Sequence, residues 1–315
     1  MNKPPKLLVI IISAFAAVNF IGIFIMATLA DLEISINITV LVEHFAFIKA
    51  FAKQMSYFGD IGLFLVVLIF GSLFINWSVH RFSKKENWFT LKIIFQILLF
   101  LFFLTALTYN LWLFNDVDPD DYVYYFLAIG LNILFALFIQ ILVMVKIKDE
   151  SGSDELIVPI INGVIYLVAL WVIITVLKYS FGRPRFRDLK PDYSDYKPWY
   201  GNILSSENRG TSFPSGHVGI VCSYLGLVWL LKPLKMDKKL IKIMLSILFS
   251  IIVVSMCFAR IAVKAHFLTD VMASTVIPIP TIWLINKMSP KLGELVTKKK
   301  QEEIEDEVYR DRPWR

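Results

Sequence analysis

The sequence predicts an all-α polytopic membrane protein, and three observations support this fold class. Hydrophobic residues make up 57% of the 315 residues and charged residues only 18%, whereas soluble chains carry about a quarter charged residues. The mean hydropathy is +0.64. The apolar residues are also grouped in long runs, many of them near the roughly 20 residues that a helix needs to cross the hydrocarbon core. Together these features exclude a soluble enzyme, a disordered chain and a disulfide-stabilised scaffold.

Eight apolar runs are predicted to form transmembrane helices. The first, Leu7–Ala30, is longer than the hydrophobic region of a signal peptide, so we expect it to be retained. Segment 31–60 carries acidic and basic side chains and is predicted to lie on the membrane surface. Pro278 and Pro280 predict a kink in the last helix. The other seven runs are Ile61–Val79, Ile93–Phe114, Tyr122–Val145, Ile157–Leu177, Pro214–Leu231, Ile243–Ala259 and Leu268–Asn286.

The distribution of loop charges predicts the orientation of these helices. If the N-terminus lies inside, the inner segments contain 21 Lys and Arg residues and the outer segments 11. Because basic residues favour the cytoplasmic side, we expect a multi-pass protein of the cell membrane with both termini in the cytoplasm. The acidic loop at 115–121 would then lie outside. Residues 1–290 are predicted to form one membrane domain and residues 291–315 a charged cytoplasmic tail.

The remaining compositional signals favour no other class. The net charge of +6 is explained by basic cytoplasmic loops, so no nucleic-acid partner is expected. Cys222 and Cys257 lie in apolar runs and are interpreted as small hydrophobic residues. His80 lies in a basic loop and His44 in the predicted surface segment, so both are interpreted as solvated or interfacial.

A first polar cluster follows the fifth predicted helix. Lys178 and Arg185 are seven residues apart at its outer end, where a lysine could act as a point charge and an arginine as a bidentate partner for a dianion. The alternative for Lys178 alone is that it extends toward lipid headgroups, as basic residues at helix ends often do.

A second cluster, Ser212–His217, reads Ser-Phe-Pro-Ser-Gly-His and precedes the sixth predicted helix. Pro214 suits a first helical turn, and Ser215 offers a hydroxyl. Gly216 lets a ligand approach the backbone amides, which bind anions at a helix start. His217 is positioned to give a proton to a bound group. The alternative is an ordinary helix start that happens to contain a histidine.

A third cluster lies between the last two predicted helices. His266 and Asp270 are four residues apart, which places them on one helical face if the segment is helical. A carboxylate that holds one imidazole nitrogen leaves the other free to attack, and Arg260 could balance charge on the attacked group. The alternative is a structural hydrogen bond between His266 and Asp270. All three clusters fall on the outer face, and together they suit transfer of a phosphoryl group through a histidine intermediate.

These clusters resemble the phosphatidic acid phosphatase type 2 superfamily, which includes lipid phosphate phosphatases and undecaprenyl-diphosphate phosphatases. The family motifs appear here as KYSFGRPRF, PSGH and ARIAVKAHFLTD. The resemblance covers roughly residues 157–286 and implies a core of six helices, so the helices over 91–145 are expected to be an added pair. Phe186 replaces the motif proline and Ala259 a common serine. Since neither position is charged or transfers protons, we expect the chemistry to survive.

The resemblance implies a role for each motif residue. His266 would be the nucleophile, Asp270 its orienting partner and His217 the acid for the leaving oxygen. The phosphate would be bound by Lys178, Arg185, Ser215, Gly216 and Arg260. No metal and no cofactor is implied. The expected substrate is a membrane lipid phosphate of the phosphatidic acid, phosphatidylglycerophosphate or polyprenyl diphosphate type, held at an extracytoplasmic site.

Three alternatives remain open at this point. One is a phosphotransferase that passes the phosphoryl group to an acceptor other than water. A second is a transport protein without chemistry, although the charged motif residues gather at helix ends rather than at the bilayer midplane. A third is a non-catalytic lipid-binding relative.

Overall fold

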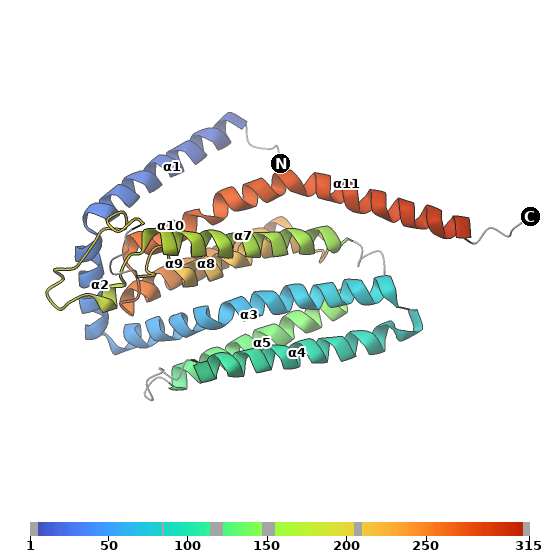
Figure 1. Ribbon diagram of the computed structural model, residues 1–315, viewed down its shortest axis with the longest axis horizontal. Helices are drawn as coiled ribbons and strands as arrows, with labels where there is room; N and C mark the ends of the chain where they lie inside the picture. Colours follow the sequence, from blue (N-terminus) through green and yellow to red (C-terminus); the bar gives the residue numbers. More distant parts are fainter. Residues whose placement is uncertain (1–5, 84, 114–121, 147–154, 205–209, 311–315) are drawn as a thin grey trace, which may run out of the picture.

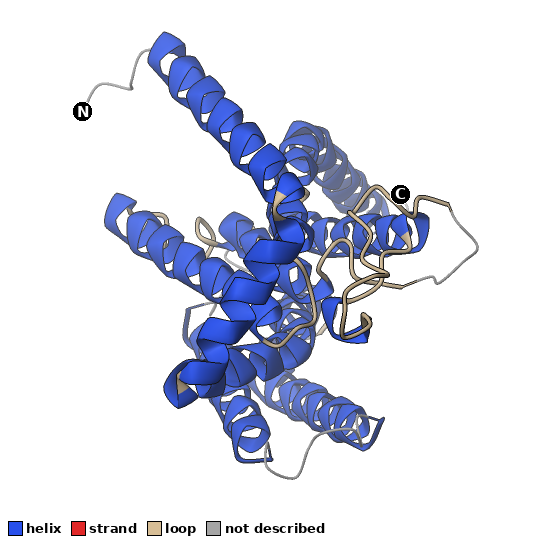
Figure 2. Cartoon of the chain, turned by 90° about the vertical axis from the view of Figure 1, so that its left-hand side faces the viewer, coloured by secondary structure: helices blue, strands red, loops and turns tan. Residues whose placement is uncertain are grey.

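The computed structural model describes residues 6–83, 85–113, 122–146, 155–204 and 210–310, and within those ranges all regular structure is helical (Figures 1 and 2). This confirms the predicted all-α class. The acidic loop at 115–121 lies outside the described residues. The described helices are α1 (Lys6–Leu29), α2 (Asp31–His44), α3 (Ala46–Phe82), η1 (Lys85–Asn87), α4 (Trp88–Leu113), α5 (Tyr122–Lys146), α7 (Ile157–Phe181), η3 (Phe186–Asp188), α8 (Gly216–Ser223), η4 (Tyr224–Leu230), α9 (Lys239–Ala262), α10 (Leu268–Val276) and α11 (Pro278–Arg310).

Among the described residues, six helices are long and apolar enough to cross a membrane, and the bent pair α1–α2 would make a seventh span. The chain is therefore a multi-pass membrane protein. The expected span at Pro214–Leu231 is a shorter helix over Gly216–Leu230, in which α8 gives way to the 3₁₀ helix η4. Such a helix is about 25 Å long, less than the roughly 30 Å of hydrocarbon that a straight span must cross.

Helix α2 turns sharply away from α1. The two helices meet at an elbow bent by 82° at Ala30, so α2 lies across the end of the bundle (Figure 1). The buried residues of α2 recur at helical spacing and face the bundle; they are Asp31, Ser35, Thr39 and Val42. The expectation of a surface helix was wrong for residues 46–60. They form the first turns of the 37-residue helix α3, because Ala52 and Ser56 are buried inside the bundle.

Helix α3 is the centre of the bundle. Helices α4 and α5 pack on one side of it, whereas α7, α8 and α9 pack on the other (Figure 1). Leu65, Phe70 and Leu73 of α3 belong to a buried apolar cluster that also includes residues of α4, α5 and α7. Helices α4 and α5 correspond to the pair expected over 91–145.

His80 corrects another expectation. It is 3% exposed, in the last turn of α3, and its Nε2 atom lies 2.7 Å from Lys92 Nζ of α4. Helix α3 continues to Phe82, beyond the predicted end at Val79. This extension carries the His80 ring into edge contact with Trp88 rather than into a solvated loop.

The last expected span is one apolar stretch, Leu268–Val296, whose helix is interrupted at a single residue beside Pro278. Helix α10 ends at Val276 and α11 begins at Pro278, because a proline lacks the amide that would continue the helical hydrogen bonds. Helix α11 then continues to Arg310, so the described part of the expected charged tail extends that helix.

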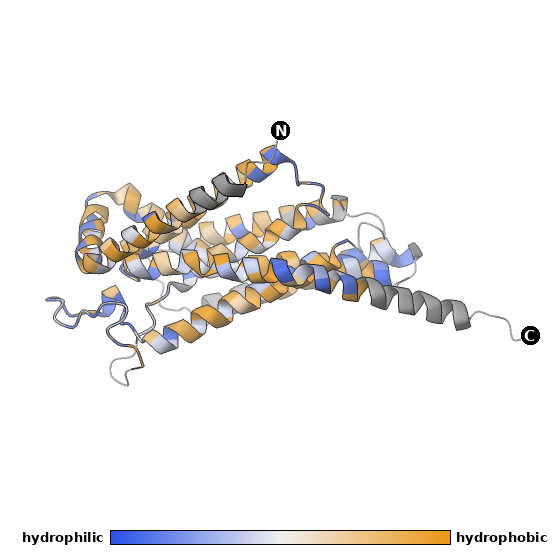
Figure 3. Cartoon of the chain, turned by 90° about the horizontal axis from the view of Figure 1, so that it is seen from above, coloured by the Kyte–Doolittle hydropathy of each residue, from blue (hydrophilic) through white to orange (hydrophobic). Residues whose placement is uncertain are grey.

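The two ends of the bundle differ in character. The α1–α2 elbow and the mostly polar loop that follows α7 lie at one end (Figures 1 and 3). The start of α4 and the far ends of α1 and α11 point the other way (Figure 1). Helix α9 joins the two ends, and its 24 residues span about 36 Å.

Candidate active site

The three predicted motif segments meet at the end of the bundle that α2 covers. Backbone hydrogen bonds join them: Ser212 N donates to Arg183 O at 2.9 Å, Ser215 N to Asp270 O at 3.1 Å, and Arg187 N to Lys264 O at 2.7 Å. The fold therefore brings together segments 178–187, 211–217 and 260–270, which are far apart in the sequence.

Two glycines allow the chain to leave α7 and meet the second motif. Gly182 ends α7 in the left-handed region at φ 56°, a conformation that costs little only without a Cβ atom. Gly210 N then donates to Gly182 O at 2.9 Å. A Cβ atom on Gly210 would lie 2.2 Å from Arg183 O, so this close approach requires glycine.

The predicted phosphate-binding cations gather around the loop before α8. Lys178 Nζ donates to Thr211 O at 2.5 Å, and Arg185 Nη2 donates to Thr211 Oγ1 at 3.2 Å. Lys178 also lies beside Gly216, where an added Cβ atom would be 3.9 Å from Nζ. Arg260 is 7% exposed, and its Nη1 donates to Ser56 Oγ of α3.

The start of α8 offers free donors beside these cations. Gly216 is the first residue of α8 and Ser215 precedes it. Pro214 was expected in the first helical turn but lies before the helix, after a cis peptide bond from Phe213. The Ser215 side chain is buried, and its Oγ has no hydrogen-bond partner in the structure. A free hydroxyl next to helix-start amides is well suited to bind an anion.

His217 is the second residue of α8 and packs against α3. A Cβ atom on Gly59 would lie 2.8 Å from His217 Cδ2 and 2.9 Å from Met256 Cε. The absence of a side chain at Gly59 therefore makes room for the imidazole.

His266 and Asp270 lie close together, but they do not share one helical face as expected. His266 lies before α10 rather than on it, and Asp270 is in the first turn of that helix. Asp270 Oδ2 folds back to accept from Phe267 N at 2.9 Å, which leaves it 3.6 Å from His266 Nδ1. This separation is longer than a hydrogen bond, and such contacts often tighten when a substrate binds.

Burial sets the protonation state of His266. The residue is 2% exposed, and burial lowers the pKa of His266 to about 3, although Asp270 acts in the opposite direction. A neutral imidazole has a lone pair available for attack. The nearby cations Arg260 and Lys178 also favour the neutral ring.

One segment of the chain matches a known protein family. Residues 160–294 match the family model described as the PAP2 superfamily. This match supports assigning the segment to that superfamily. This confirms the resemblance found in the sequence, and the family suggests a phosphatase that acts on lipid phosphates. No curated protein and no solved structure showed significant similarity to the chain.

The two departures from the PAP2 motifs occupy packed positions. Phe186 is 4% exposed and its ring lies against Tyr193 and Phe267. Ala259 is completely buried in a small cluster with Val42 of α2 and Ala52 of α3. Both residues therefore contribute to packing around the site.

The aromatic segment 193–200 packs between Phe213, before α8, and helix α1. The Trp199 ring stacks on Phe213 and also contacts Phe24 of α1. Trp199 Nε1 donates to Thr28 Oγ1 at 3.2 Å. Trp199 thus attaches the first helix to the loop before α8, a role that the sequence did not predict.

Sequence reasoning also missed two charged residues and one hydroxyl. Arg183 lies inside the first motif but was given no role, and Asp31 was assigned to the surface segment. Arg183 Nη1 donates to Asp270 Oδ1 at 2.7 Å and Nη2 to Asp31 Oδ2 at 2.8 Å. Ser212 Oγ donates to Asp270 Oδ2 at 2.5 Å. The available signal for Asp31 was a single acidic residue directly after a long apolar run.

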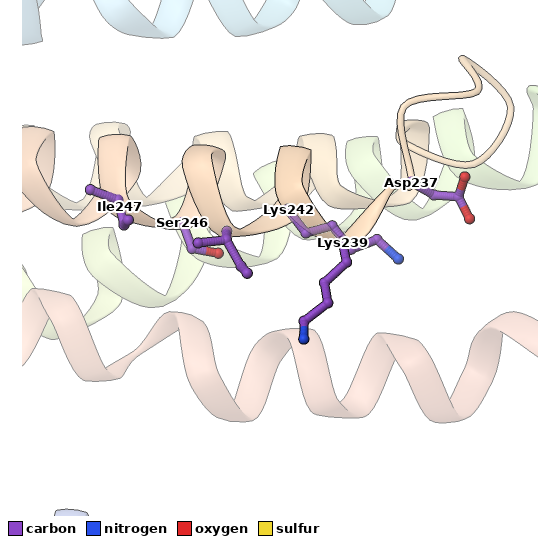
Figure 4. Close-up of a pocket in the computed structure, with 6 residues that line it drawn as sticks. Asp237, Lys239, Lys242, Ser246 and Ile247 are labelled. Carbon is purple, nitrogen blue, oxygen red and sulfur yellow. The ribbon is translucent and has the colours of Figure 1, made fainter. Parts of the chain in front are cut away.

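Among the described residues, neither a metal cluster nor a second groove contributes to this site. In the part of the chain that the structure describes, no three His, Cys, Asp or Glu side chains are grouped to hold a metal ion. A groove of about 450 Å³ lies at the start of α9 and is lined by exposed lysines among other residues. Figure 4 shows how these side chains lie on the helix. The groove lies at the opposite end of α9 from Arg260 and so is separate from the motif residues.

Proposed function

We propose that this protein is a metal-independent phosphatase that hydrolyses a lipid phosphate or diphosphate through a phosphohistidine at His266. The observation that carries the proposal is the buried His266 imidazole, which lies beside Asp270 in a site bordered by Lys178 and Arg260. A neutral nucleophile within a positively charged site suits attack on a dianionic phosphoryl group.

The phosphoryl group would be held by the cations and by the start of α8. Lys178, Arg185 and Arg260 would balance its charge, while Ser215 Oγ and the Gly216 amide would donate hydrogen bonds. The unpartnered, buried Ser215 hydroxyl supports this assignment, because burying such a group without a partner is costly.

The first chemical step would transfer the phosphoryl group to the enzyme. The His266 Nε2 lone pair attacks phosphorus, the bond from phosphorus to the leaving oxygen breaks, and protonated His217 gives that oxygen a proton. Asp270 would stabilise the positive charge that forms on the His266 ring. The dephosphorylated lipid leaves as an alcohol or, from a diphosphate, as a monophosphate.

The second step would return the enzyme to its starting state. A water molecule gives a proton to His217 and attacks phosphorus, and the bond to His266 breaks. Inorganic phosphate is released, and His217 is protonated again. Over both steps one water molecule is consumed for each phosphate ester or anhydride cleaved.

The proposed site faces the extracytoplasmic side, and its substrate is an amphiphile. Loop charges support this orientation, since 21 of the 32 basic residues fall in the segments assigned to the cytoplasm. The proposed substrate types are phosphatidic acid, phosphatidylglycerophosphate and polyprenyl diphosphate, all of which present a terminal phosphate at a membrane surface.

Phosphate release from a panel of these lipids tests the proposal. We expect the purified protein to release inorganic phosphate in excess chelator, and His266→Gln to be about 10³-fold slower or more. Product analysis in the presence of an alcohol acceptor separates hydrolysis from phosphoryl transfer. Activity that disappears with the chelator and returns with a divalent ion would contradict the proposal, as would near-normal turnover by His266→Gln.

A further inference from the structure

Arg183 is a completely buried charged side chain near the site, as is Asp270. Arg183 is 0% exposed, and its guanidinium lies 3.8 Å from the centre of the Phe267 ring. Its nitrogen atoms donate to Asp270, Asp31, Thr269 Oγ1 and the carbonyl of Lys197. A buried guanidinium is tolerated only when its charge and its donors are satisfied, so this arrangement is highly specified.

Asp31, the first residue of α2, also belongs to the buried cluster of charges that Arg183 and Asp270 form. It is 2% exposed. Besides pairing with Arg183, Asp31 accepts from Thr269 N at 3.0 Å and from Thr269 Oγ1. Asp31 therefore caps the start of α10 from a different helix, at the residue directly before Asp270.

The two oxygen atoms of the Asp270 carboxylate have different partners. Oδ1 accepts from Arg183, whereas Oδ2 accepts from Ser212 and Phe267 N and faces His266. Because one oxygen is held by Arg183, the carboxylate cannot rotate without breaking a buried ion pair. Oδ2 is thereby kept in the orientation that the His266 ring requires.

The cluster of Asp31, Arg183 and Asp270 also carries an excess of negative charge. One arginine is shared by two carboxylates, so Asp31, Arg183 and Asp270 together carry one net negative charge when all are ionised. That negative charge can stabilise the positive charge that forms on the His266 ring when the ring is phosphorylated.

From these contacts we infer that Arg183 and Asp31 are positioning residues that act on His266 through Asp270. The inference rests on the proposed phosphohistidine mechanism. It extends the site to the α1–α2 elbow, which lies outside the matched segment 160–294. Neither residue is among those assigned to bind the phosphate. Their effect is confined to the orientation and charge balance of the carboxylate behind the nucleophile.

The test compares Asp31→Asn and Arg183→Lys with a control for loss of a buried hydrogen bond. Tyr166→Phe is that control, because Tyr166 is 0% exposed and donates to Cys222 O at 2.9 Å away from the motif residues. Each purified variant is assayed for kcat and KM with a lipid phosphate. Inhibition by orthovanadate, which mimics the five-coordinate transition state, is compared with inhibition by inorganic phosphate.

We expect Asp31→Asn and Arg183→Lys to lower kcat by about 10- to 100-fold with KM within about twofold, since small errors of alignment reduce the chemical step. The inhibition constant for vanadate should rise in parallel with the loss of kcat, whereas that for phosphate should stay constant. Tyr166→Phe should match the wild type in kcat and in both constants.

Three outcomes would overturn the inference. Unchanged kcat in both variants would remove the positioning role. Parallel weakening of vanadate and phosphate would show that the residues only maintain the binding site. Failure of both variants to fold would show that the group is required for stability alone. A wild-type protein without phosphatase activity would instead contradict the proposed function, so the two failures are distinguishable.

Discussion

At the scale of single residues, burial determines what each titratable group can do. His266 is kept neutral by its surroundings, with a pKa of about 3 instead of 6.5. Ser215 is buried without a partner, and Arg260 is held against α3 by Ser56. The same residue types at a surface would be solvated and would have no fixed direction.

The depressed pKa of His266 predicts how stability depends on pH. Between pH 6.5 and 3 the unfolded chain binds a proton at this residue that the folded protein does not bind. Stability should therefore fall as the pH drops below about 6.5, by up to roughly 3 kcal/mol at pH 4 from this group alone.

Thermal unfolding of the detergent-purified protein at pH 7 and pH 4 measures this effect. His266→Gln cannot bind the proton, so its Tm should fall less than that of the wild type over the same interval. An equal fall in both proteins would show that His266 is not the group responsible.

The motif residues could be recognised from the sequence because their types and spacings are unusual in an apolar chain. The residues that form hydrogen bonds and ion pairs with these motif residues could not be recognised in the same way. Ser212 lay inside a quoted motif, yet its bond to Asp270 depends on a loop approaching α10. Asp31 is 239 positions before Asp270, and only the elbow at Ala30 brings it into the site.

At the scale of secondary-structure elements, α3 supplies one wall of the site. Gly59 makes room for His217, and Ser56 accepts from Arg260. The sequence assigned residues 46–60 to the surface because basic residues interrupt the apolar pattern. The helical phase that buries Ala52 and Ser56 was not evident without the neighbouring helices. The shortness of α8 was equally hidden, since its apolar run continues into η4.

Gly59→Ala should impair catalysis by displacing His217. The added methyl group would lie 2.8 Å from His217 Cδ2, too close for a stable contact, and we expect kcat to fall by about 100-fold. Steady-state kinetics with a lipid phosphate measures the effect.

Gly130→Ala is the matched control, because no atom lies within 4 Å of a Cβ added to Gly130 in α5. It should retain full activity and gain about 0.5–1 kcal/mol of stability from its better helix propensity. Full activity of Gly59→Ala would show that this wall does not constrain His217.

At the scale of the whole molecule, all three motifs lie at one end of the bundle, the end that α2 covers. The composition and the long apolar runs were sufficient to predict an all-α membrane protein. The count of spans was less predictable, since an apolar run of suitable length need not be a continuous α-helix. The proposed orientation depends on loop charges and has a direct test.

Cysteine labelling in intact cells tests that orientation, in a background lacking Cys222 and Cys257. Ser194 is exposed in the loop after α7, and Asp237 is exposed before α9 at the other end of the bundle. A membrane-impermeant thiol reagent should label Ser194→Cys but not Asp237→Cys until the membrane is permeabilised. The reverse pattern would place the proposed site on the cytoplasmic face.

The stereochemical course of hydrolysis at phosphorus tests the phosphohistidine mechanism most directly. A lipid phosphorothioate made chiral with oxygen isotopes is hydrolysed in water labelled with the third isotope, and the configuration of the released thiophosphate is determined. Each in-line displacement inverts phosphorus, so transfer to His266 and then to water predicts overall retention. Overall inversion would mean that water attacks the substrate directly, and it would contradict the role assigned to His266.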